Sequence, residues 1–365
     1  MEQDELLSRT ISFLRFPLIV GVVFIHNNMS VVNIQGDIIR FDQWPAVPFI
    51  MNICSYVIAA ISVPLFFIFS GYLLFYKIKN YNLSIYKQKL NSRSKSLLIP
   101  YLIWNFIGFL VLLIELHPLL SSLFPLLKDY KIDITHFLSF FWIAKLPISM
   151  SGPANPINTP LWFVRDIIVL VILSPIIYWA INKMKYFFIS ILFVIWFFTL
   201  GKHINFPGLC HQSLFFFPLG AYLSINKINF VQLVEDMKWT PYLYIPIAIV
   251  DTLTINESYN YLIHHVGIII GIIAVIYSAS ALIKKRDVKT NAFLSNASFF
   301  VYALHNLFIG KCTKIIMILI HPNTPYLIII IYFFMVLFTI IVCLLIYWLL
   351  SKNLPSVAKI VTGGR

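Results

Sequence analysis

An arginine and a histidine interrupt the first strongly apolar stretch of the sequence, FLRFPLIVGVVFIHNN at residues 13–28. In an α-helix, Arg15 and His26 would lie within about 20° of the same face and about 16 Å apart along the axis. A charged side chain in a membrane-spanning helix costs at least ~2.5 kcal/mol when it is central and faces lipid, so it usually faces a bundle interior or an aqueous cavity. The pair therefore predicts a shared cavity with a cation at one depth and an imidazole at another. The alternative is that Arg15 extends its guanidinium to the membrane surface.

Further polar groups are predicted at the depth of Arg15. The second apolar segment ends SVPLFFIFSGYLLFYK, which places Ser70 and Gly71 near the inner surface, and the third begins RSKSLLIPY with Arg93 and Lys95. Guanidinium and ammonium groups bind phosphates. Together with Arg15, these groups predict a site for a phosphate-rich cytosolic ligand. Ser70 and Gly71 also have a structural interpretation, because small residues allow helices to approach closely.

A second set of polar residues is predicted toward the outer surface. The segment NTPLWFVRDIIVL places Trp162, Arg165 and Asp166 near the depth of His26, and SFFVYALHNLF places Tyr302 and His305 in the middle to outer part of its helix. These five residues are candidates for acceptor binding. Two structural alternatives remain: Arg165 and Asp166 form an ion pair that only supports the fold, and His305 is an interior histidine without a chemical role.

The composition indicates the elements that must position these residues. The chain has 365 residues, of which 60% are hydrophobic and 11% are charged, and its mean hydropathy is +0.86. No polar block is large enough to fold alone, so we expect one all-α membrane domain over 1–365, a polytopic helix bundle. No small-residue cleavage site follows the first apolar run, so we expect the first helix to be retained. About ten segments are predicted to span the membrane: 11–32, 51–76, 96–116, 160–181, 186–201, 210–226, 240–255, 262–283, 294–320 and 326–350.

The distribution of positive charge predicts the orientation. The net charge of +13 would suggest a nucleic-acid partner in a soluble protein. With the N-terminus inside, however, the only lysines and arginines predicted in outer loops are Arg40, Lys128, Lys131, Lys145 and Lys202. Because basic residues are retained on the cytoplasmic side of short loops, both termini are predicted to be cytoplasmic. The charge then indicates membrane topology and contact of the basic loop 77–96 with anionic lipid, with no nucleic acid as partner.

Histidine has the opposite distribution. All nine histidines fall in the outer half or in outer loops under this topology. This distribution also has a structural explanation, because an outer membrane interface tolerates a neutral, amphipathic side chain. Adjacent His264 and His265 would point about 100° apart on a helix, which makes a poor metal site. The four cysteines have no metal-ligand spacing, so the sequence predicts neither a metal site nor a disulfide framework. Two amphipathic stretches in the outer connection 117–159, at 117–127 and 134–146, are predicted to lie along the outer surface or over a cavity.

Five segments resemble motifs of the acyltransferase-3 family of integral membrane acyltransferases, and they occur in the same order and with similar spacing as in that family. They are RFPLIVGVVFIH, PLFFIFSGYLL, the basic run before LLIPY, PLWFVRDIIVL and SFFVYALH. The resemblance implies a ten-helix bundle, in a bacterial inner membrane, that transfers an acyl group, usually acetyl, from cytosolic acyl-CoA to a hydroxyl of an extracytoplasmic glycan or glycolipid. Acyl-CoA would be a co-substrate, and no bound cofactor is expected.

The resemblance also implies roles for the candidate residues. His26 would be the catalytic base, with Arg15 as its partner in the motif, and Arg15, Ser70, Arg93 and Lys95 would bind acyl-CoA. A neutral histidine near pH 7 is suited to take the proton of a sugar hydroxyl as it attacks a thioester. Either Arg165 or a backbone N–H would stabilise the oxyanion. The acceptor, the size of the acyl group and the oligomeric state stay open.

A different class of function also fits buried ionisable residues. A secondary transporter or lipid-linked glycan flippase would use such residues as a proton or substrate pathway. Transporters commonly contain a repeat between their halves. The second segment, with its Ser-Gly end, has no counterpart later in the chain, which favours the acyltransferase.

Overall fold

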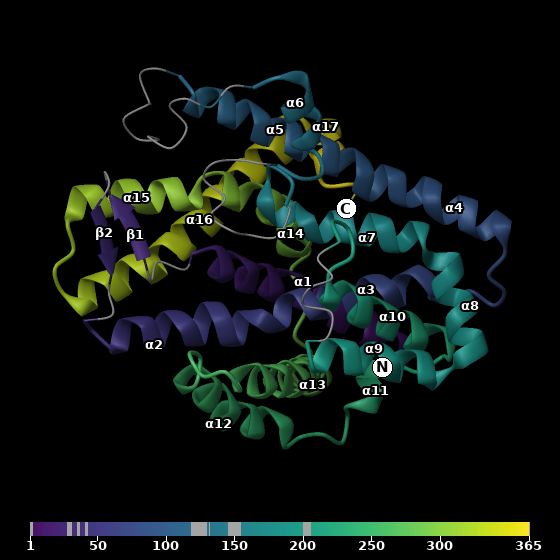
Figure 1. Ribbon diagram of the computed structural model, residues 1–365. Helices are drawn as coiled ribbons and strands as arrows, with labels where there is room; N and C mark the ends of the chain where they lie inside the picture. The colour runs from purple at the N-terminus through teal and green to yellow at the C-terminus, as the bar shows by residue number, and fades with distance from the viewer. Residues whose placement is uncertain are drawn as a thin grey trace.

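Five helical runs are long and apolar enough to cross a membrane, and they form the frame of the molecule (Figure 1). The computed structural model describes residues 3–27, 31–34, 37–40, 43–117, 130, 132–144, 155–199 and 206–364. π-helical and 3-10 turns interrupt two of the runs without ending them. The five are α1 (Gln3–His26); α2 (Ala46–Asn52) with η1 (Ile53–Ile58), η2 (Ala59–Ile61) and α3 (Ser62–Phe75); α4 (Leu83–Arg93) with η3 (Ser94–Leu98) and α5 (Ile99–Glu115); α13 (Asn260–Arg286); and α16 (Pro325–Asn353).

Two bent helix pairs also have the apolar composition of a membrane span. The first bends by 64° and the second by 50°. Pro175 follows the first break, where a proline cannot donate the backbone hydrogen bond that would continue the helix. The first pair comprises η6 (Thr159–Leu161), α7 (Trp162–Ile172) and α8 (Ser174–Met184), and the second comprises α14 (Ala292–Leu304), η7 (His305–Leu307) and α15 (Ile309–Ile320).

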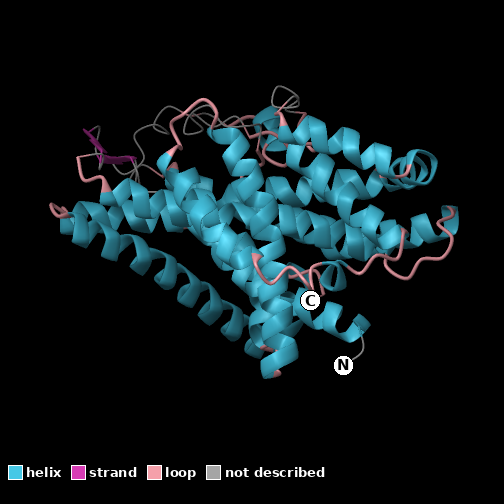
Figure 2. Cartoon of the chain, turned by 90° about the horizontal axis from the view of Figure 1, so that it is seen from below, coloured by secondary structure: helices cyan, strands magenta, loops and turns pink. Residues whose placement is uncertain are grey.

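Shorter elements complete the described part of the chain. Strands β1 (Val31–Ile34) and β2 (Asp37–Arg40) pair antiparallel as a hairpin at one edge of the helices (Figure 2). The remaining helices are α6 (Ile134–Ser139), α9 (Tyr186–Phe197), α10 (His211–Ile225), α11 (Phe230–Leu233), α12 (Thr240–Leu253) and α17 (Pro355–Val361).

The structure confirms the predicted helical membrane architecture in its main features. Each of the ten predicted segments contains a helix. By length and composition, however, five described runs qualify as spans, or up to seven if each bent pair is one span. The count of ten and the cytoplasmic side of the termini therefore stay predictions. The hairpin over 31–40 was not predicted.

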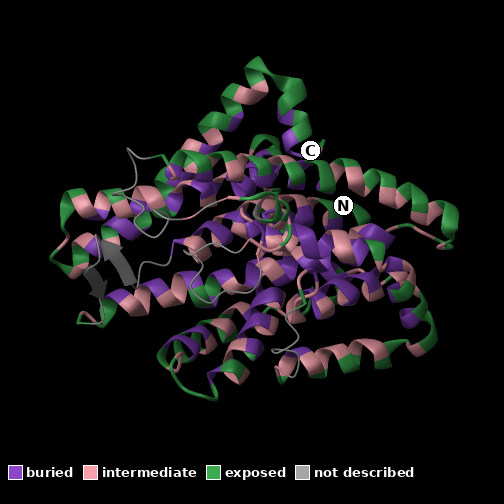
Figure 3. Cartoon of the chain, turned by 45° about the horizontal axis from the view of Figure 1, so that its top comes forward, coloured by how far each residue is buried: buried purple, intermediate pink, exposed green. Residues whose placement is uncertain are grey.

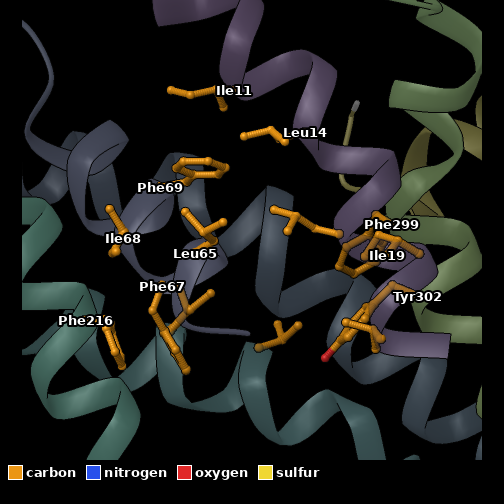
Figure 4. Close-up of a cluster of buried hydrophobic side chains, with 14 of the residues drawn as sticks. Ile11, Leu14, Ile19, Leu65, Phe67, Ile68, Phe69, Phe216, Phe299 and Tyr302 are labelled. Atoms are coloured by element: carbon orange, nitrogen blue, oxygen red, sulfur yellow. The ribbon is translucent and has the colours of Figure 1, made fainter. Parts of the chain in front are cut away.

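Helix α1 packs at the centre of the bundle, against α3, α13 and α14. Its side chains Ile11, Leu14 and Ile19 are buried among side chains of those neighbours (Figure 4). Buried residues are concentrated around this central region, and the outer helices are mostly exposed on one side (Figure 3). The side of α1 that carries these three residues therefore faces protein.

Helices α3 and α10 approach closely through reciprocal glycines. A Cβ added at Gly71 of α3 would lie 2.0 Å from the backbone oxygen of Phe217, and one added at Gly220 of α10 would lie 2.1 Å from that of Ile68. No larger residue fits at either position without moving a backbone. The structure thus confirms the packing interpretation of Gly71 and leaves its neighbour Ser70 free to face another direction.

Ion pairs join the segments that were predicted to be cytoplasmic. Arg9 of α1 donates a hydrogen bond to Asp287 after α13 at 2.7 Å, and Lys77 after α3 pairs with Asp4 at 3.2 Å. The guanidinium of Arg9 lowers the pKa of the Asp287 carboxyl. These contacts place the three segments at the same end of the bundle, as the predicted topology requires.

The outer connection is described only in part. Residues 118–129, 131 and 145–154 lie outside the described residues, so the predicted stretch at 117–127 is not described beyond His117. In the second stretch, α6 and the following turn fold back onto α5, where Phe137 and Phe140 contact Phe109 at ring-centroid distances of 5.0 and 5.9 Å. This part of the connection is therefore packed onto the bundle.

Candidate active site

Among the cavities beside α1, two each contain one of the two residues that interrupt its apolar sequence. The first, which we call the arginine cavity, has a volume of about 160 Å³. Arg15 enters it from α1, Ser70 from α3 and Arg93 from the end of α4. Its other lining residues are Ile11, Ile19, Phe66, Phe69, Leu73, Leu97, Phe163, Val164, Ile167, Val171, Ser295, Ser298, Phe299 and Tyr302.

The two guanidinium groups of the arginine cavity lack acidic partners. Arg15 and Arg93 have no hydrogen bond or ion pair with any residue that the structure describes, and their positive charges lie close enough to repel each other. Both side chains are partly buried. Two partly buried cations that face one cavity make it an anion-binding site, because an anion with several charged oxygens would offset the repulsion.

The second cavity, which we call the histidine cavity, has a volume of about 280 Å³. His26 enters it from the C-terminal end of α1, and Trp162 from the start of α7. The π-helix η1 contributes Ser55 and Tyr56, and such segments are frequent at functional sites. Its other lining residues are Val22, Ile25, Ala60, Val63, Phe66, Pro160, Phe163, Gln212, His264 and Tyr302.

His26 is free to act on a bound molecule. Its ring lies beside that of His305, with 5.2 Å between centroids, and makes no hydrogen bond to a described residue. The next residue fixes this end of the helix, because the Asn27 side chain donates to the Tyr332 backbone oxygen at 2.9 Å. His26 therefore stands on an anchored helix end, and neither ring nitrogen is bonded to a described residue.

His305 is fully buried and is held by its own helix. Its Nδ1 lies 3.1 Å from the backbone oxygen of Val301, so it donates that hydrogen, and Nε2 has no partner among the described residues. His305 is not part of either cavity lining, but it contacts both His26 and Tyr302, with 6.4 Å between the ring centroids of His305 and Tyr302. The structure thus places the candidate His305 behind His26.

The two cavities share three wall residues, Phe66, Phe163 and Tyr302. Phe163 contacts both of the others, with ring centroids 6.0 Å from Phe66 and 6.2 Å from Tyr302. The Tyr302 hydroxyl donates a hydrogen bond to the Pro160 backbone oxygen. In place of the single cavity expected from the sequence, the structure has two that adjoin at these aromatic side chains.

Arg165 and Asp166 lie outside both cavity linings and connect α7 to two other segments. Arg165 donates to the Trp142 backbone oxygen at 2.7 Å and lies 5.5 Å from the centre of that indole ring. Asp166 is 3.4 Å from the Arg165 guanidinium and accepts a hydrogen bond from the Cys210 backbone at 2.9 Å. These contacts support the structural alternative, in which the pair positions the outer connection and the start of α10.

The structure brings the sequence candidates together in two groups. Arg15, Ser70 and Arg93 meet in the arginine cavity, whereas His26 and Trp162 meet in the histidine cavity, with Tyr302 in the wall between them. The remaining basic candidate, Lys95, is exposed on η3 and is not part of the arginine cavity lining.

Sequence reasoning missed an Asp-His pair on the histidine cavity. The Nδ1 of His264 is 2.8 Å from Oδ2 of Asp251, which is buried. The His264 ring stacks on Tyr56 with 4.5 Å between centroids. The signal in the sequence was Asp251 itself, a carboxylate in the apolar run PYLYIPIAIVDTL of α12, since ionisable residues in such runs mark functional positions. By contrast, His265 bonds the Phe197 backbone oxygen and stacks on Trp196.

Comparisons with known proteins agree with this architecture. Residues 9–348 match the family described as the acyltransferase domain of the acyltransferase-3 group. The chain is also 26% identical over 236 residues to succinoglycan biosynthesis protein ExoH of Rhizobium meliloti, a match that covers 62% of the chain and 56% of ExoH. No solved structure shows a significant match. Because the family match spans nearly the whole sequence and the apolar helices are those of a multi-pass membrane protein, the chain belongs to the acyltransferase-3 family.

Proposed function

We propose that this acyltransferase moves an acyl group, acetyl in our proposal, from cytosolic acyl-CoA to a hydroxyl of an extracytoplasmic glycan or glycolipid. The observation that carries the proposal is the pair of adjoining cavities, one with two guanidinium groups that have no partner among the described residues and the other with His26, joined by a wall of three side chains. A donor with phosphates and an acceptor with a hydroxyl need these two chemical environments side by side.

The arginine cavity suits the donor. Arg15 and Arg93 bind phosphate oxygens of coenzyme A, because guanidinium groups form strong paired hydrogen bonds with phosphate, and Ser70 supplies a further polar contact. The acyl end then lies against the apolar side chains of the same cavity, next to Phe66 and Phe163.

The histidine cavity suits the acceptor. His26 takes the proton of the acceptor hydroxyl, whose oxygen forms a bond to the thioester carbonyl carbon. The carbon–sulfur bond breaks, and the proton passes to the sulfur, so that an ester and free coenzyme A thiol are formed. A positioned base contributes about 10²- to 10⁴-fold to such a step. Trp162 and Tyr302 flank the acceptor, and His305 supports His26 from behind.

Arg165 is assigned a positioning role in this proposal. Its guanidinium is occupied by Trp142 and Asp166 and faces neither cavity. Stabilisation of the oxyanion is therefore assigned to a hydrogen-bond donor other than Arg165. A backbone N–H is the alternative that the sequence left open.

The similarity to a succinoglycan biosynthesis protein supports a polysaccharide or its lipid-linked precursor as acceptor. In our proposal the acceptor lies on the outer side of the plasma membrane and the donor on the inner side. We therefore place the protein in the plasma membrane of a bacterium, with the arginine cavity toward the cytoplasm.

Release of free thiol tests the proposal. Purified protein is given acetyl-CoA and the surface polysaccharide of its source cells after mild alkali has removed its esters. We expect thiol release that requires both substrates and is lost in His26→Ala, while His321→Asn, at an exposed position with a left-handed backbone, retains activity. Movement of unmodified glycan across a membrane without thiol release would instead support the transporter or flippase.

A further inference from the structure

We propose that His264, held by Asp251, binds the acceptor glycan through a hydrogen bond that its Nε2 accepts from a hydroxyl adjacent to the one that is acylated. This inference rests on the proposed function of the histidine cavity. It adds a positioning residue on the wall formed by α13, a helix whose residues the sequence did not connect with the reaction.

The hydrogen bonds around His264 fix one side of its ring. A carboxylate only accepts hydrogen bonds, so Nδ1 of His264 donates to Asp251 across 2.8 Å. Asp251 is itself held, because the Asn260 side chain donates to its other carboxylate oxygen at 2.9 Å. The ring face is covered by Tyr56. The orientation of the imidazole is thus set by three residues, as in sites where a carboxylate holds a histidine in one tautomer.

The remaining ring nitrogen is available to a ligand. Nε2 of His264 has no partner among the described residues, and the side chain contributes to the histidine cavity lining. Gln212, on the same lining, also has no hydrogen bond within the described part of the chain. Binding pockets orient a polar ligand with a few polar groups of fixed direction that lie next to aromatic rings. A sugar, with apolar ring faces and neighbouring hydroxyls, matches Tyr56, His264 and Gln212.

The contacts separate the role of His264 from that of His26. His26 lies against His305, which contacts Tyr302 of the shared wall, so His26 is next to the place where the acyl group arrives. The ring contacts of His264 are with Tyr56 and His265, and none is with a shared wall residue. His26 is therefore the base, and His264 holds the acceptor at a distance from the reacting carbon.

Two substitutions distinguish acceptor binding from support of the fold. In His264→Asn the new amide lies near the position of Nδ1 and retains the bond to Asp251, but it has no group that reaches the cavity. In His264→Gln the amide lies near the position of Nε2 and retains the group that faces the cavity. Neither amide acts as a base. Thiol release is measured with acetyl-CoA and the alkali-treated surface polysaccharide described above, after gel filtration shows that each full-length variant is folded.

Acceptor binding predicts an asymmetric result. We expect His264→Asn to raise the KM for the polysaccharide roughly ten-fold, because a hydrogen bond of about 1–2 kcal/mol is lost, and His264→Gln to stay within about three-fold of the wild type. The kcat and the KM for acetyl-CoA should change little in both. A wild-type KM for the polysaccharide in His264→Asn but not in His264→Gln would make His264 a structural residue and overturn the proposal. An unchanged KM in both variants would also overturn it.

Two other results also overturn it. A large fall in kcat in both variants, with normal KM, would make His264 a base. Absence of turnover in the wild type would refute the proposed function itself, and with it this inference. Failure of this inference and failure of the proposed function are distinguishable. If only the inference fails, the wild type still releases thiol in a reaction that depends on His26.

Discussion

The arginine cavity and the histidine cavity share Phe66, Phe163 and Tyr302, yet the polar groups that they contain differ in kind. The first has two guanidinium groups without an acidic partner in the described part of the chain, whereas the second has two imidazoles, an amide and aromatic rings. Guanidinium groups keep their charge at every physiological pH and bind anions, whereas imidazole gains and loses a proton near neutrality. In our proposal, substrate charge is therefore bound on one side of the wall and protons are moved on the other.

The largest effect is expected for substitution of the base in the histidine cavity, which should change turnover but not donor binding. His26→Ala should lower kcat by about 10²- to 10⁴-fold, since it removes the base. The Kd for acetyl-CoA, measured by equilibrium dialysis, should stay at the wild-type value because His26 is not part of the arginine cavity lining. A variant that lost donor binding together with turnover would show that the two cavities are not independent sites.

The next effect concerns donor affinity. Arg93→Gln should weaken acetyl-CoA binding by roughly 10- to 100-fold, because hydrogen bonds to charged groups are worth about 1.5–3 kcal/mol. Lys95→Gln is the matched control, since Lys95 is two residues away, also positively charged and exposed outside the cavity lining. Isothermal calorimetry at two salt concentrations measures both. Equal losses in the two variants would indicate a diffuse basic surface instead of a site built around Arg93.

The shared wall should set the size of the acyl group. Phe163→Ala removes a side chain that lines both cavities, so butyryl-CoA, which is two methylenes longer than acetyl-CoA, should gain roughly ten-fold in kcat/KM relative to acetyl-CoA, a change typical of one or two methylenes in an apolar pocket. Phe163→Leu, which retains most of the volume, should keep the wild-type preference. An unchanged chain-length profile in Phe163→Ala would show that the acyl group takes another path.

The smallest effect is expected at Ser70. Ser70→Ala removes one neutral hydroxyl from the arginine cavity, and a change of about 1 kcal/mol, or roughly five-fold in the Kd for acetyl-CoA, should follow. Gly71→Ala is a useful contrast, because an added Cβ would collide with the Phe217 backbone and should lower the thermal stability instead. A loss of stability in Ser70→Ala would assign Ser70 to helix packing as well.

Much of this arrangement was predictable because it depends on short-range helix geometry. The angle between Arg15 and His26, the depth of Ser70 and the positions of Trp162 and Tyr302 follow from helical periodicity and from the direction in which each segment crosses the membrane. These residues meet in the predicted groups. The sequence also left two interpretations of Ser70-Gly71: the structure confirms helix packing at Gly71 and places Ser70 on the arginine cavity, where ligand binding stays a prediction.

The parts of the site that the sequence did not predict depend on contacts between distant segments, which no local sequence pattern encodes. The partner of His264 is Asp251, on a different helix, and the partner of Arg165 is the Trp142 backbone, in the outer connection. Whether Arg15 and His26 share one cavity depends on where Phe66, Phe163 and Tyr302 meet, and they come from three different helices. The bends between α7 and α8 and between α14 and α15 likewise arise within segments that read as continuous apolar runs.

Transfer across sealed membrane vesicles tests the central claim most directly, because acetyl-CoA does not cross a bilayer. Radiolabelled acetyl-CoA is added to inside-out and right-side-out vesicles from cells that contain the protein and its glycan acceptor. We predict acetyl ester on the glycan only in inside-out vesicles, where the donor reaches the arginine cavity, with the ester on the enclosed face. Equal or greater transfer in intact right-side-out vesicles would place both substrates on the histidine side and contradict the account.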